Sequence, residues 1–461
     1  MAHQKSDSRS QPSDQARDRW LFYAFVTALL TIVFVSGALV TAAGIAPGRQ
    51  IARAYDAGQA YYRKVTASGN VYQDSDLWRP STTTHTGVTV LDEDRVQPGF
   101  TLYTSGEATS AYLVNMHGRI LHRWHRPFSE IWSKEASPVA NPQPDDHVYF
   151  RAAKLFPNGD LLVVIEGNGD TPYGYAVAKL DKDSNLLWIR HLRAHHDIEV
   201  GDDGRIYVLT HDIVNASLEN FDSLAEARIE DYLVVLTPEG EEISRIALTE
   251  LVARSPYAQL LYKVASYSTA DPLHTNAVQP IGAEAAAGTP IADPGDVLVS
   301  FRELNAIGII DLEQEQLTWA TQGPWLGQHY PVLLGNGNIL LFDNRGNFDL
   351  PGGGSRILEL NPISMEIVWQ YKGTPAHPFF SAIRGDQQRL TNGNTLITES
   401  DTGRIFEVTR SEDRVWEYFN PARTDGDSER IAIVNHAQRL PESQARWLFR
   451  DTSALARKSP K

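Results

Sequence analysis

The sequence predicts an all-β protein, a six-bladed β-propeller that follows one N-terminal transmembrane helix. Three observations predict it. An uncharged apolar stretch lies near the N-terminus, apolar strands recur on both sides of short glycine turns, and a second type of strand recurs that ends in tryptophan. Blades of four strands that repeat about every 40–50 residues are typical of propellers. The 461 residues, 42% of them hydrophobic, are enough for a large core.

The N-terminal segment predicts a membrane anchor. Residues 1–19 are polar and form a short cytoplasmic tail, and Trp20–Pro47 carries no charge. That stretch exceeds the roughly 20 residues needed to cross a bilayer and the roughly 7–15 of a signal-peptide core. A signal peptide cleaved near Thr41–Gly44 is the alternative. Because a short polar tail precedes a large domain, we expect residues 20–47 to be a signal anchor with the C-terminal domain on the periplasmic side.

Residues 48–97 connect the anchor to the repeats. Residues 50–66 predict a helical stalk, and residues 67–97, rich in Ser, Thr, Asp and Gly, predict an extended leader. We place the propeller at residues 98–441 and a C-terminal tail at 442–461.

Hairpin turns mark the first two strands of each blade. Asn-Gly and Asp-Gly supply the positive φ angles that tight hairpins require. The turn glycines are spaced 45, 91, 42 and 56 residues apart, and the long interval spans two repeats with insertions: Gly159, Gly204, Gly295, Gly337 and Gly393.

The outer strands repeat as well, and each is expected to place its tryptophan between blades. These strands end in Trp124, Trp188, Trp319, Trp369 and Trp416. The repeats predict five blades at 149–193, 195–248, 273–323, 328–373 and 380–420. Residues 99–127 and 433–441 are left over, and together they predict a sixth blade that closes the ring. Insertions are expected at 128–148, 213–231, 249–272 and 281–293, several of them near one mouth of the channel.

A shared register predicts a site at the channel mouth. Arg151, His196 and His329 each lie eight residues before a turn glycine, while His274 and His436 each lie four residues before an apolar residue, as His196 does. The innermost strands of a propeller place equivalent positions around one ring, so these side chains should converge. Convergent imidazoles could bind a transition metal or carry out group transfer. Arg151 and Arg302 favour the second, because permanent positive charge suits an anionic substrate.

Composition excludes several classes of function. The chain has no cysteine, so disulfides, thiolate nucleophiles and cysteine metal sites are excluded. Its net charge of -15 does not provide the basic face of a nucleic-acid-binding protein.

Four strings in family order resemble the bacterial arylsulfotransferases, which do not use phosphoadenosine phosphosulfate. They are HHDIEV (195–200), DPLHTNAV (271–278), SFR (300–302) and GQHYPVLLGNGNILLFDN (327–344). The resemblance implies a six-bladed propeller that moves a sulfuryl group from a phenol sulfate to another phenol by a ping-pong route, without a metal or other cofactor. It assigns the nucleophile to His329 and further catalytic roles to His196, His274 and Arg302, with Asn276 beside them. Arg151 and His436 are additional substrate-binding candidates from the register.

The physical chemistry of sulfuryl transfer agrees with these roles. A loose transition state spreads negative charge over the equatorial oxygens, which Arg302, His274 and Asn276 could stabilise. His196 is suited to move the phenolic proton. The adjacent His195 and Asp197 should point to the opposite face of the strand, so we expect them to be structural.

Departures from the family keep other functions open. The N-terminal β-sandwich of known members is missing and an anchor replaces it, and an insertion separates Asn276 from Arg302. The chain could instead be a non-catalytic, membrane-tethered binding or scaffold subunit of a membrane complex. A calcium-centred lactonase would need a ring of Asn, Asp and Glu where histidines lie. A quinone-dependent dehydrogenase usually has more blades than six.

Overall fold

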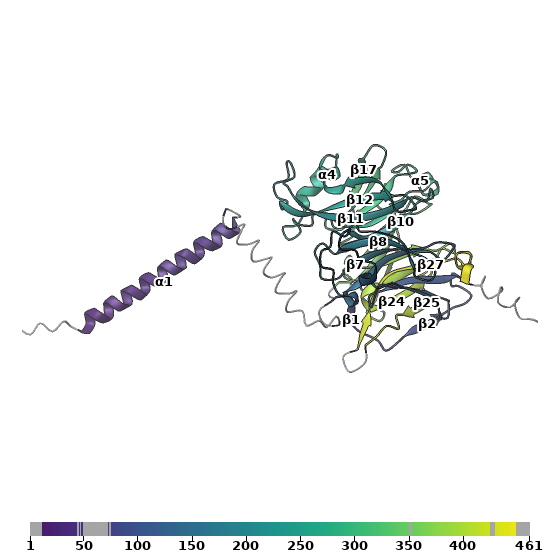
Figure 1. The fold of residues 1–461 in the computed structure, drawn as a ribbon, viewed down its shortest axis with the longest axis horizontal. Coiled ribbons are helices and arrows are strands. Elements are labelled where there is room, and N and C mark those ends of the chain that lie inside the picture. Colours follow the sequence, from purple (N-terminus) through teal and green to yellow (C-terminus); the bar gives the residue numbers. More distant parts are fainter. Residues whose placement is uncertain are drawn as a thin grey trace, which may run out of the picture. The chain divides into compact units, whose positions relative to one another are not determined.

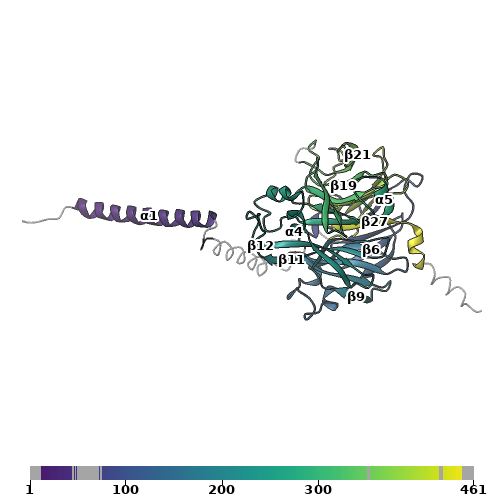
Figure 2. The same cartoon turned by 90° about the horizontal axis from the view of Figure 1, so that it is seen from above.

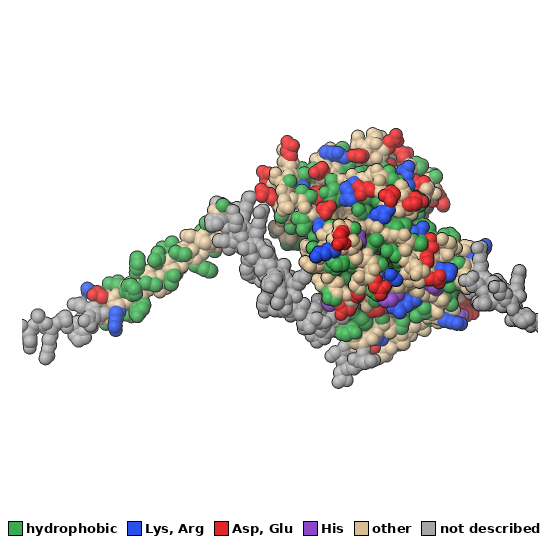
Figure 3. Space-filling view, in the orientation of Figure 1, with side chains coloured by type: hydrophobic (Ala, Val, Ile, Leu, Met, Phe, Trp, Pro, Cys, Tyr) green, Lys and Arg blue, Asp and Glu red, His purple; other side chains and the backbone are tan. Residues whose placement is uncertain are grey.

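The computed structural model describes residues 12–43, 46, 48, 72, 75–349, 353–424 and 429–448. The chain divides into two compact units, Met1–Asn70 and Val71–Lys461. The first contains helix α1, Pro12–Ala42. Within the described residues, its Ala16–Ala42 portion is the one helix long and apolar enough to cross a membrane, a test that an N-terminal signal sequence also passes. Figure 3 shows hydrophobic side chains along α1, with charged groups near its N-terminal end. The expected stalk at 50–66 lies outside the described residues.

The second unit is a six-bladed β-propeller of four-stranded antiparallel sheets, which confirms the predicted fold class (Figure 1). Blade 1 consists of β27 (Val434–Leu440), β3 (Phe100–Ser105), β4 (Ser110–Val114) and β5 (Ile120–His125). Blade 2 consists of β6 (Val148–Leu155), β7 (Leu161–Gly167), β8 (Gly174–Leu180) and β9 (Leu186–Arg190). Blade 3 consists of β10 (Ala194–Val200), β11 (Ile206–Asn215), β12 (Ala227–Leu236) and β13 (Glu242–Ala247).

Blades 4 to 6 follow in chain order. Blade 4 consists of β14 (Thr275–Pro280), β15 (Val297–Phe301), β16 (Ala306–Asp311) and β17 (Gln316–Gln322). Blade 5 consists of β18 (His329–Leu333), β19 (Ile339–Asp343), β20 (Arg356–Leu360) and β21 (Ile367–Lys372). Blade 6 consists of β22 (Asp386–Arg389), β23 (Thr395–Glu399), β24 (Arg404–Val408) and β25 (Arg414–Phe419). In the view of Figure 2, β9 of blade 2 and β21 of blade 5 lie on opposite sides, with β27 between them.

The C-terminal strand closes the ring as the leftover segments predicted. β27 pairs antiparallel with β3, from Val434 opposite Ser105 to Leu440 opposite Phe100. The pairing joins the C-terminal strand to the N-terminal part of the propeller within one sheet, so the ring has no gap between its first and last strands. Beyond β27, the turn η5 (Glu442–Ala445) buries Ala445, and Trp447 packs edge-on against His122. The first part of the segment expected to be a tail therefore belongs to the packed domain.

The leader contributes two strands that the sequence did not mark individually. β1 (Trp78–Pro80) pairs with β26 (Arg430–Ala432) as a separate ribbon. β2 (Gly87–Leu91) pairs with β25 and becomes a fifth strand on the outside of blade 6. Part of the segment before residue 98 is thus integrated into the propeller.

The hydrophobic core lies between neighbouring blades. One cluster joins Leu340 and Phe342 of blade 5 with Ile397 and Phe406 of blade 6, all of them fully buried. Alternate side chains of each strand point to opposite faces of the sheet, so each blade packs against both of its neighbours.

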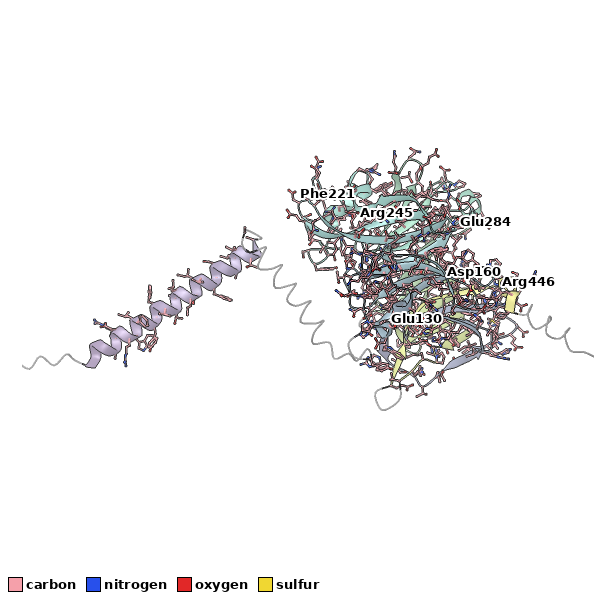
Figure 4. All side chains as sticks on the ribbon, viewed as in Figure 1. Glu130, Asp160, Phe221, Arg245, Glu284 and Arg446 are labelled. Carbon is pink, nitrogen blue, oxygen red and sulfur yellow. The ribbon has the colours of Figure 1, made fainter. Side chains whose placement is uncertain are left out.

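The predicted insertions contain short helices and loops. They include η1 (Phe128–Glu130), η2 (Asp145–His147), α4 (Leu248–Ala253), η3 (Ala258–Lys263) and α5 (Ala283–Ala287), and η4 (Ser400–Thr402) follows β23. Phe221 and Glu284, labelled in Figure 4, lie on opposite sides of this part of the domain. The main-chain N–H groups of residues 225 and 229 donate to the carbonyls of residues 269 and 270, so the insertions at 213–231 and 249–272 lie together. Gly282 instead lies beside Asp202, in the hairpin turn between β10 and β11. The insertion at 281–293 therefore lies at the other end of the strands from that at 213–231.

Candidate active site

A cavity of about 250 Å³ opens where the innermost strands begin. Four of the predicted residues line it: Arg151, His196, His274 and Arg302. Further lining residues come from the leader, from β6 and the end of β7, and from the loops after β7 and before β22: Asp76, Tyr149, Glu166, Gly167, Asn168, Gly169, Asp170, Tyr173, Ile383 and Arg384. The structure thus brings together side chains from blades 2, 3 and 4 and from the entrance to blade 6.

His196 and His274 form the imidazole pair of this cavity. Their ring centroids are 5.0 Å apart, and Tyr173 contacts both rings. Both residues have left-handed backbones, with φ of 55° and 46°. Non-glycine residues seldom adopt this conformation, and it tends to persist at functional sites. The main-chain N–H of His196 donates to Glu166 Oε1 at 2.6 Å, which helps to hold the unusual turn.

The strand pairing revises one part of the predicted register. The last paired residue of the innermost strand before the hairpin turn is Val200 in β10, Pro280 in β14 and Leu333 in β18. Val200 therefore corresponds to Pro280 in blade 4, and not to Val278 as the sequence register predicted. Four residues before these positions lie His196, Asn276 and His329, and each count crosses a bulge in its strand. His274 lies two residues before Asn276, immediately before β14, and it reaches the cavity because the chain turns there.

His329 is held as a neutral imidazole in a single tautomer. Its Nδ1 lies 2.7 Å from Asn344 Oδ1 and 3.2 Å from the carbonyl of Gly327. The Asn344 amide nitrogen donates to the carbonyls of Ser381 and Arg384, so its oxygen must accept and His329 Nδ1 must carry the proton. Nε2 is buried without a hydrogen-bond partner. The lone pair of Nε2 is therefore free, although the His329 residue as a whole is 0% exposed.

Two arginines surround this histidine with positive charge. Burial and then the charges of Arg302 and Arg151 hold the pKa of His329 well below its usual value, so the ring is neutral near pH 7. Arg302 lies on the loop after β15 and forms an ion pair with Glu303. Arg151 donates to the carbonyl of Asn435 at 3.0 Å, and another of its guanidinium nitrogens is buried without a partner. An anionic group in the cavity would satisfy that nitrogen.

The two cavity imidazoles have opposite protonation tendencies. Burial lowers the pKa of His274, but the carboxylate of Asp271, 2.5 Å from His274 Nδ1, outweighs it and raises the pKa overall. Burial and the nearby His274 lower the pKa of His196 well below its usual value. The cavity therefore combines an imidazole whose positive form is favoured by a carboxylate with one whose neutral form is favoured by burial.

Three predicted site residues, Asn276, His329 and His436, are not among the residues that line the cavity. The amide of Asn276 donates to the carbonyl of Gln328 at 2.8 Å, so it joins blade 4 to the segment that carries His329. His436 Nδ1 lies 2.8 Å from Asp386 Oδ2, and its ring stacks on Tyr330. Asp197 accepts from the hydroxyl of Tyr330 and the main chain of Val278, a structural role as expected.

Sequence reasoning missed several residues of the site. Asn344 ends the last quoted string but received no role. Asp76 crosses from the leader to Arg384, with an oxygen–nitrogen distance of 2.8 Å. Burial disfavours its charge, but Arg384 outweighs that effect and lowers the pKa of Asp76 to about 2. Nothing local in the sequence marks Asp76 or Tyr173, because only the closed ring brings them to the mouth.

Comparisons with known proteins identify a family. The model of the arylsulfotransferase (ASST) family matches residues 152–421. No curated protein matches. Similar solved structures include a Bacteroides caccae protein of unknown function at 12% identity and TM-score 0.45, covering 74% of this chain and 98% of its own. A streptogramin B lyase has 14% identity, TM-score 0.39, and coverage of 79% and 97%. The Cps50 (Swd1) β-propeller domain of Myceliophteria thermophila has 11% identity, TM-score 0.39, and coverage of 76% and 91%.

Proposed function

The chain belongs to the arylsulfotransferase family, and we propose that it transfers a sulfuryl group from a phenolic sulfate ester to a phenolic acceptor through a sulfohistidine at His329. One observation carries the proposal. His329 Nε2 has an unused lone pair, because Asn344 fixes the proton on Nδ1. Two arginines near that ring supply charge for a sulfate.

Substrate binding would use the positive groups of the cavity. A phenolic sulfate carries one negative charge spread over three terminal oxygens. Arg302, Arg151 and protonated His274 offer donors to those oxygens, and each interaction strengthens as charge moves onto them in the transition state. Tyr173, whose pKa is raised well above its usual value by burial and by Asp271, stays protonated and offers a further donor.

The first half-reaction forms a nitrogen–sulfur bond. The Nε2 lone pair of His329 attacks sulfur while the bond from sulfur to the phenolic oxygen breaks. The departing oxygen takes a proton from His196, so a neutral phenol leaves. The His329 ring keeps its Nδ1 proton on Asn344, so the positive ring balances the negative sulfonate.

The second half-reaction reverses these steps with another phenol. His196 removes the proton from the acceptor, the phenolic oxygen attacks sulfur, and the bond between sulfur and His329 breaks. Neutral His196, whose pKa burial lowers, is in the form that this step requires. No nucleotide or metal enters either step.

The location of the enzyme forms part of the same proposal. We take α1 to be an uncleaved anchor and the propeller to lie on the periplasmic side. The helix Ala16–Ala42 has the length and composition for this role. The substrates would then be small phenols and phenol sulfates outside the cytoplasm.

The test is a half-reaction with donor alone. Wild-type protein incubated with a nitrophenyl sulfate should gain about 80 Da on His329, measured by intact and peptide mass spectrometry. His329→Ala should lose both the adduct and turnover, because no neighbouring side chain can replace the nucleophile. The matched control is His117→Ala, the same change at an exposed turn, and it should keep both. A wild-type protein that turns over without an adduct would refute the covalent route, and absence of all turnover would favour a binding or scaffold role.

A further inference from the structure

A buried pair lies behind His196 and away from the cavity lining. His195 Nδ1 is 2.8 Å from His196 Nδ1, and His195 Nε2 is 3.6 Å from Asp231 Oδ1. His195 is 0% exposed and Asp231 2%. His195 Nε2 has no hydrogen-bond partner. A carboxylate, an imidazole and a second imidazole therefore lie in series, and the last one faces the substrate cavity.

We propose that Asp231 and His195 form a proton relay that sets His196 as an acid or as a base in the two half-reactions. This inference rests on the proposed sulfuryl transfer and names two positioning residues for it. Neither residue contacts the cavity, so each would act only through His196.

The relay requires the 3.6 Å separation between Asp231 Oδ1 and His195 Nε2 to close to hydrogen-bonding distance, and it then has two states. Asp231 Oδ2 accepts the main-chain N–H of Thr275 at 2.7 Å, so only Oδ1 is available to His195. When Oδ1 is ionised, His195 carries its proton on Nε2, its Nδ1 accepts from His196, and His196 Nε2 presents a lone pair to the cavity. When Oδ1 is protonated, it donates to His195 Nε2, His195 Nδ1 donates to His196, and His196 Nε2 carries a proton. One proton on Asp231 thus decides whether His196 can donate or accept.

The relay balances across the catalytic cycle. In the first half-reaction, His196 gives its Nε2 proton to the departing phenolic oxygen, His195 passes its Nδ1 proton to His196, and Asp231 passes its own to His195 Nε2. Asp231 ends ionised. In the second half-reaction, the acceptor proton enters at His196 Nε2 and the shifts reverse. The carboxylate therefore holds the proton between half-reactions.

Asp231 is tuned to change charge in the required range. Burial first, and then the charge of Asp271, raise the pKa of Asp231 to about 7. The titratable or charged groups that face the relay are Arg151, Tyr173, His196, His211, Asp271 and His274. Burial holds the pKa of His195 down at about 3, so His195 moves protons without itself staying charged.

A metal ion would be a competing use of these side chains. One ligand atom each of His195, His211 and Asp231 lies within 4.8 Å of the others. However, the main-chain N–H of Gly174 donates to His211 Nε2 at 3.1 Å, so Nδ1 carries the proton and has no lone pair to give. His211 also stacks on His195 with centroids 4.4 Å apart. The arrangement fits a packed, neutral His211 rather than a metal ligand.

Asp231→Asn tests the relay with a nearly isosteric change. The amide oxygen can still accept from Thr275, which turns the NH₂ toward His195 Nε2 and fixes His196 with its Nε2 proton on. Adduct formation from a nitrophenyl sulfate should stay within about threefold of wild type, because nitrophenolate leaves without taking a proton. Transfer from the adduct to unsubstituted phenol should fall about 10²-fold, because the base is lost. Transfer to a nitrophenol that is already ionised should be nearly unchanged.

Two controls keep the outcome specific. Asp386→Asn makes the same change at a buried carboxylate paired with His436, and it should not alter the preference between the two acceptors. His195→Gln removes the imidazole that joins Asp231 to His196. It should therefore reproduce the Asp231→Asn preference for ionised nitrophenol over unsubstituted phenol. Equal loss with both acceptors, or no loss with either, would overturn the relay while leaving the His329 adduct intact.

A measurement on the wild-type protein covers the case in which the variants do not fold. Transfer from preformed adduct to phenol should rise about tenfold as pH increases from 6 to 8, because Asp231 ionises and His196 becomes the base. Adduct formation from unsubstituted phenyl sulfate, whose leaving phenol needs a proton, should fall over the same range. Identical pH profiles for the two half-reactions would overturn the relay, and absence of any adduct would instead refute the proposed function.

Discussion

Asn344 is the side chain that fixes the tautomer of His329, the proposed nucleophile, although it would not touch the substrate. Its amide donates to two carbonyls and leaves only its oxygen for His329 Nδ1. An isosteric carboxylate would still accept that proton but would add a negative charge. A carboxylate beside an imidazole raises its pKa and favours the imidazolium, which has no lone pair for attack.

Asn344→Asp should therefore lower adduct formation about 10²-fold at pH 7. The sign of the pH effect follows from the raised His329 pKa: the loss should grow below pH 7 and shrink as pH rises and the ring deprotonates. Stopped-flow release of nitrophenol between pH 6 and 9 measures it. Asn361→Asp is the control, because Asn361 Oδ1 only accepts main-chain N–H groups in a turn and a carboxylate can do the same. A pH-independent loss at position 344 would mean that the damage is structural.

Among individual residues, the sequence predicted the side chains that line the cavity better than the buried side chains that set their protonation. His196, His274, Arg151 and Arg302 do line one cavity. The catalytic assignments themselves stay predictions until they are tested. Asp231 was not singled out, because its relation to His195 depends on how two strands pair across a bulge. His195 is expected from the sequence to be structural because alternate strand residues point to opposite faces. It is buried outside the cavity lining, and its part in a relay is a proposal.

The outer strands show how the repeats fix the fold. Their tryptophans reach the adjacent blade, as expected. Trp124 Nε1 donates to the carbonyl of Gly159 in blade 2, Trp369 to that of Arg410 in blade 6, and Trp416 to that of Met116 in blade 1. The repeated turns and tryptophans were thus enough to predict six blades. β1 and β2 escaped prediction because they are short and carry no turn signal, and only tertiary pairing makes them strands.

Trp124→Ala should destabilise the propeller by about 3–5 kcal/mol, the usual cost of removing a large buried aromatic side chain. Trp124 is 0% exposed and also packs against Trp447. The measurement is the shift of the urea unfolding midpoint followed by circular dichroism. Trp369→Ala is the matched control, because that side chain is only half-buried beneath Arg389 and Arg410. We expect it to cost less than half as much, and equal costs would show that the ring does not depend on burial between blades 1 and 2.

The whole chain joins an apolar helix to a domain that has its own closed core. The propeller closes through β27 and β3 and has its own hydrophobic clusters, so its folding does not require α1. An acidic, cysteine-free domain is compatible with either side of a membrane. The side of the membrane on which the propeller lies must therefore be determined by the orientation of α1.

Alkaline phosphatase fused at the C-terminus should be active in a bacterial host and should pellet with membranes, because α1 would carry the domain outward and stay embedded. Removing residues 1–70 provides the matched control: the fusion should then be soluble and inactive in the cytoplasm, while the propeller keeps its β-sheet circular dichroism. A full-length fusion that is active but released from membranes, with a new N-terminus near residue 44, would identify a cleaved signal peptide. A full-length fusion that is inactive at the membrane would place the propeller in the cytoplasm and remove extracytoplasmic phenols as its substrates.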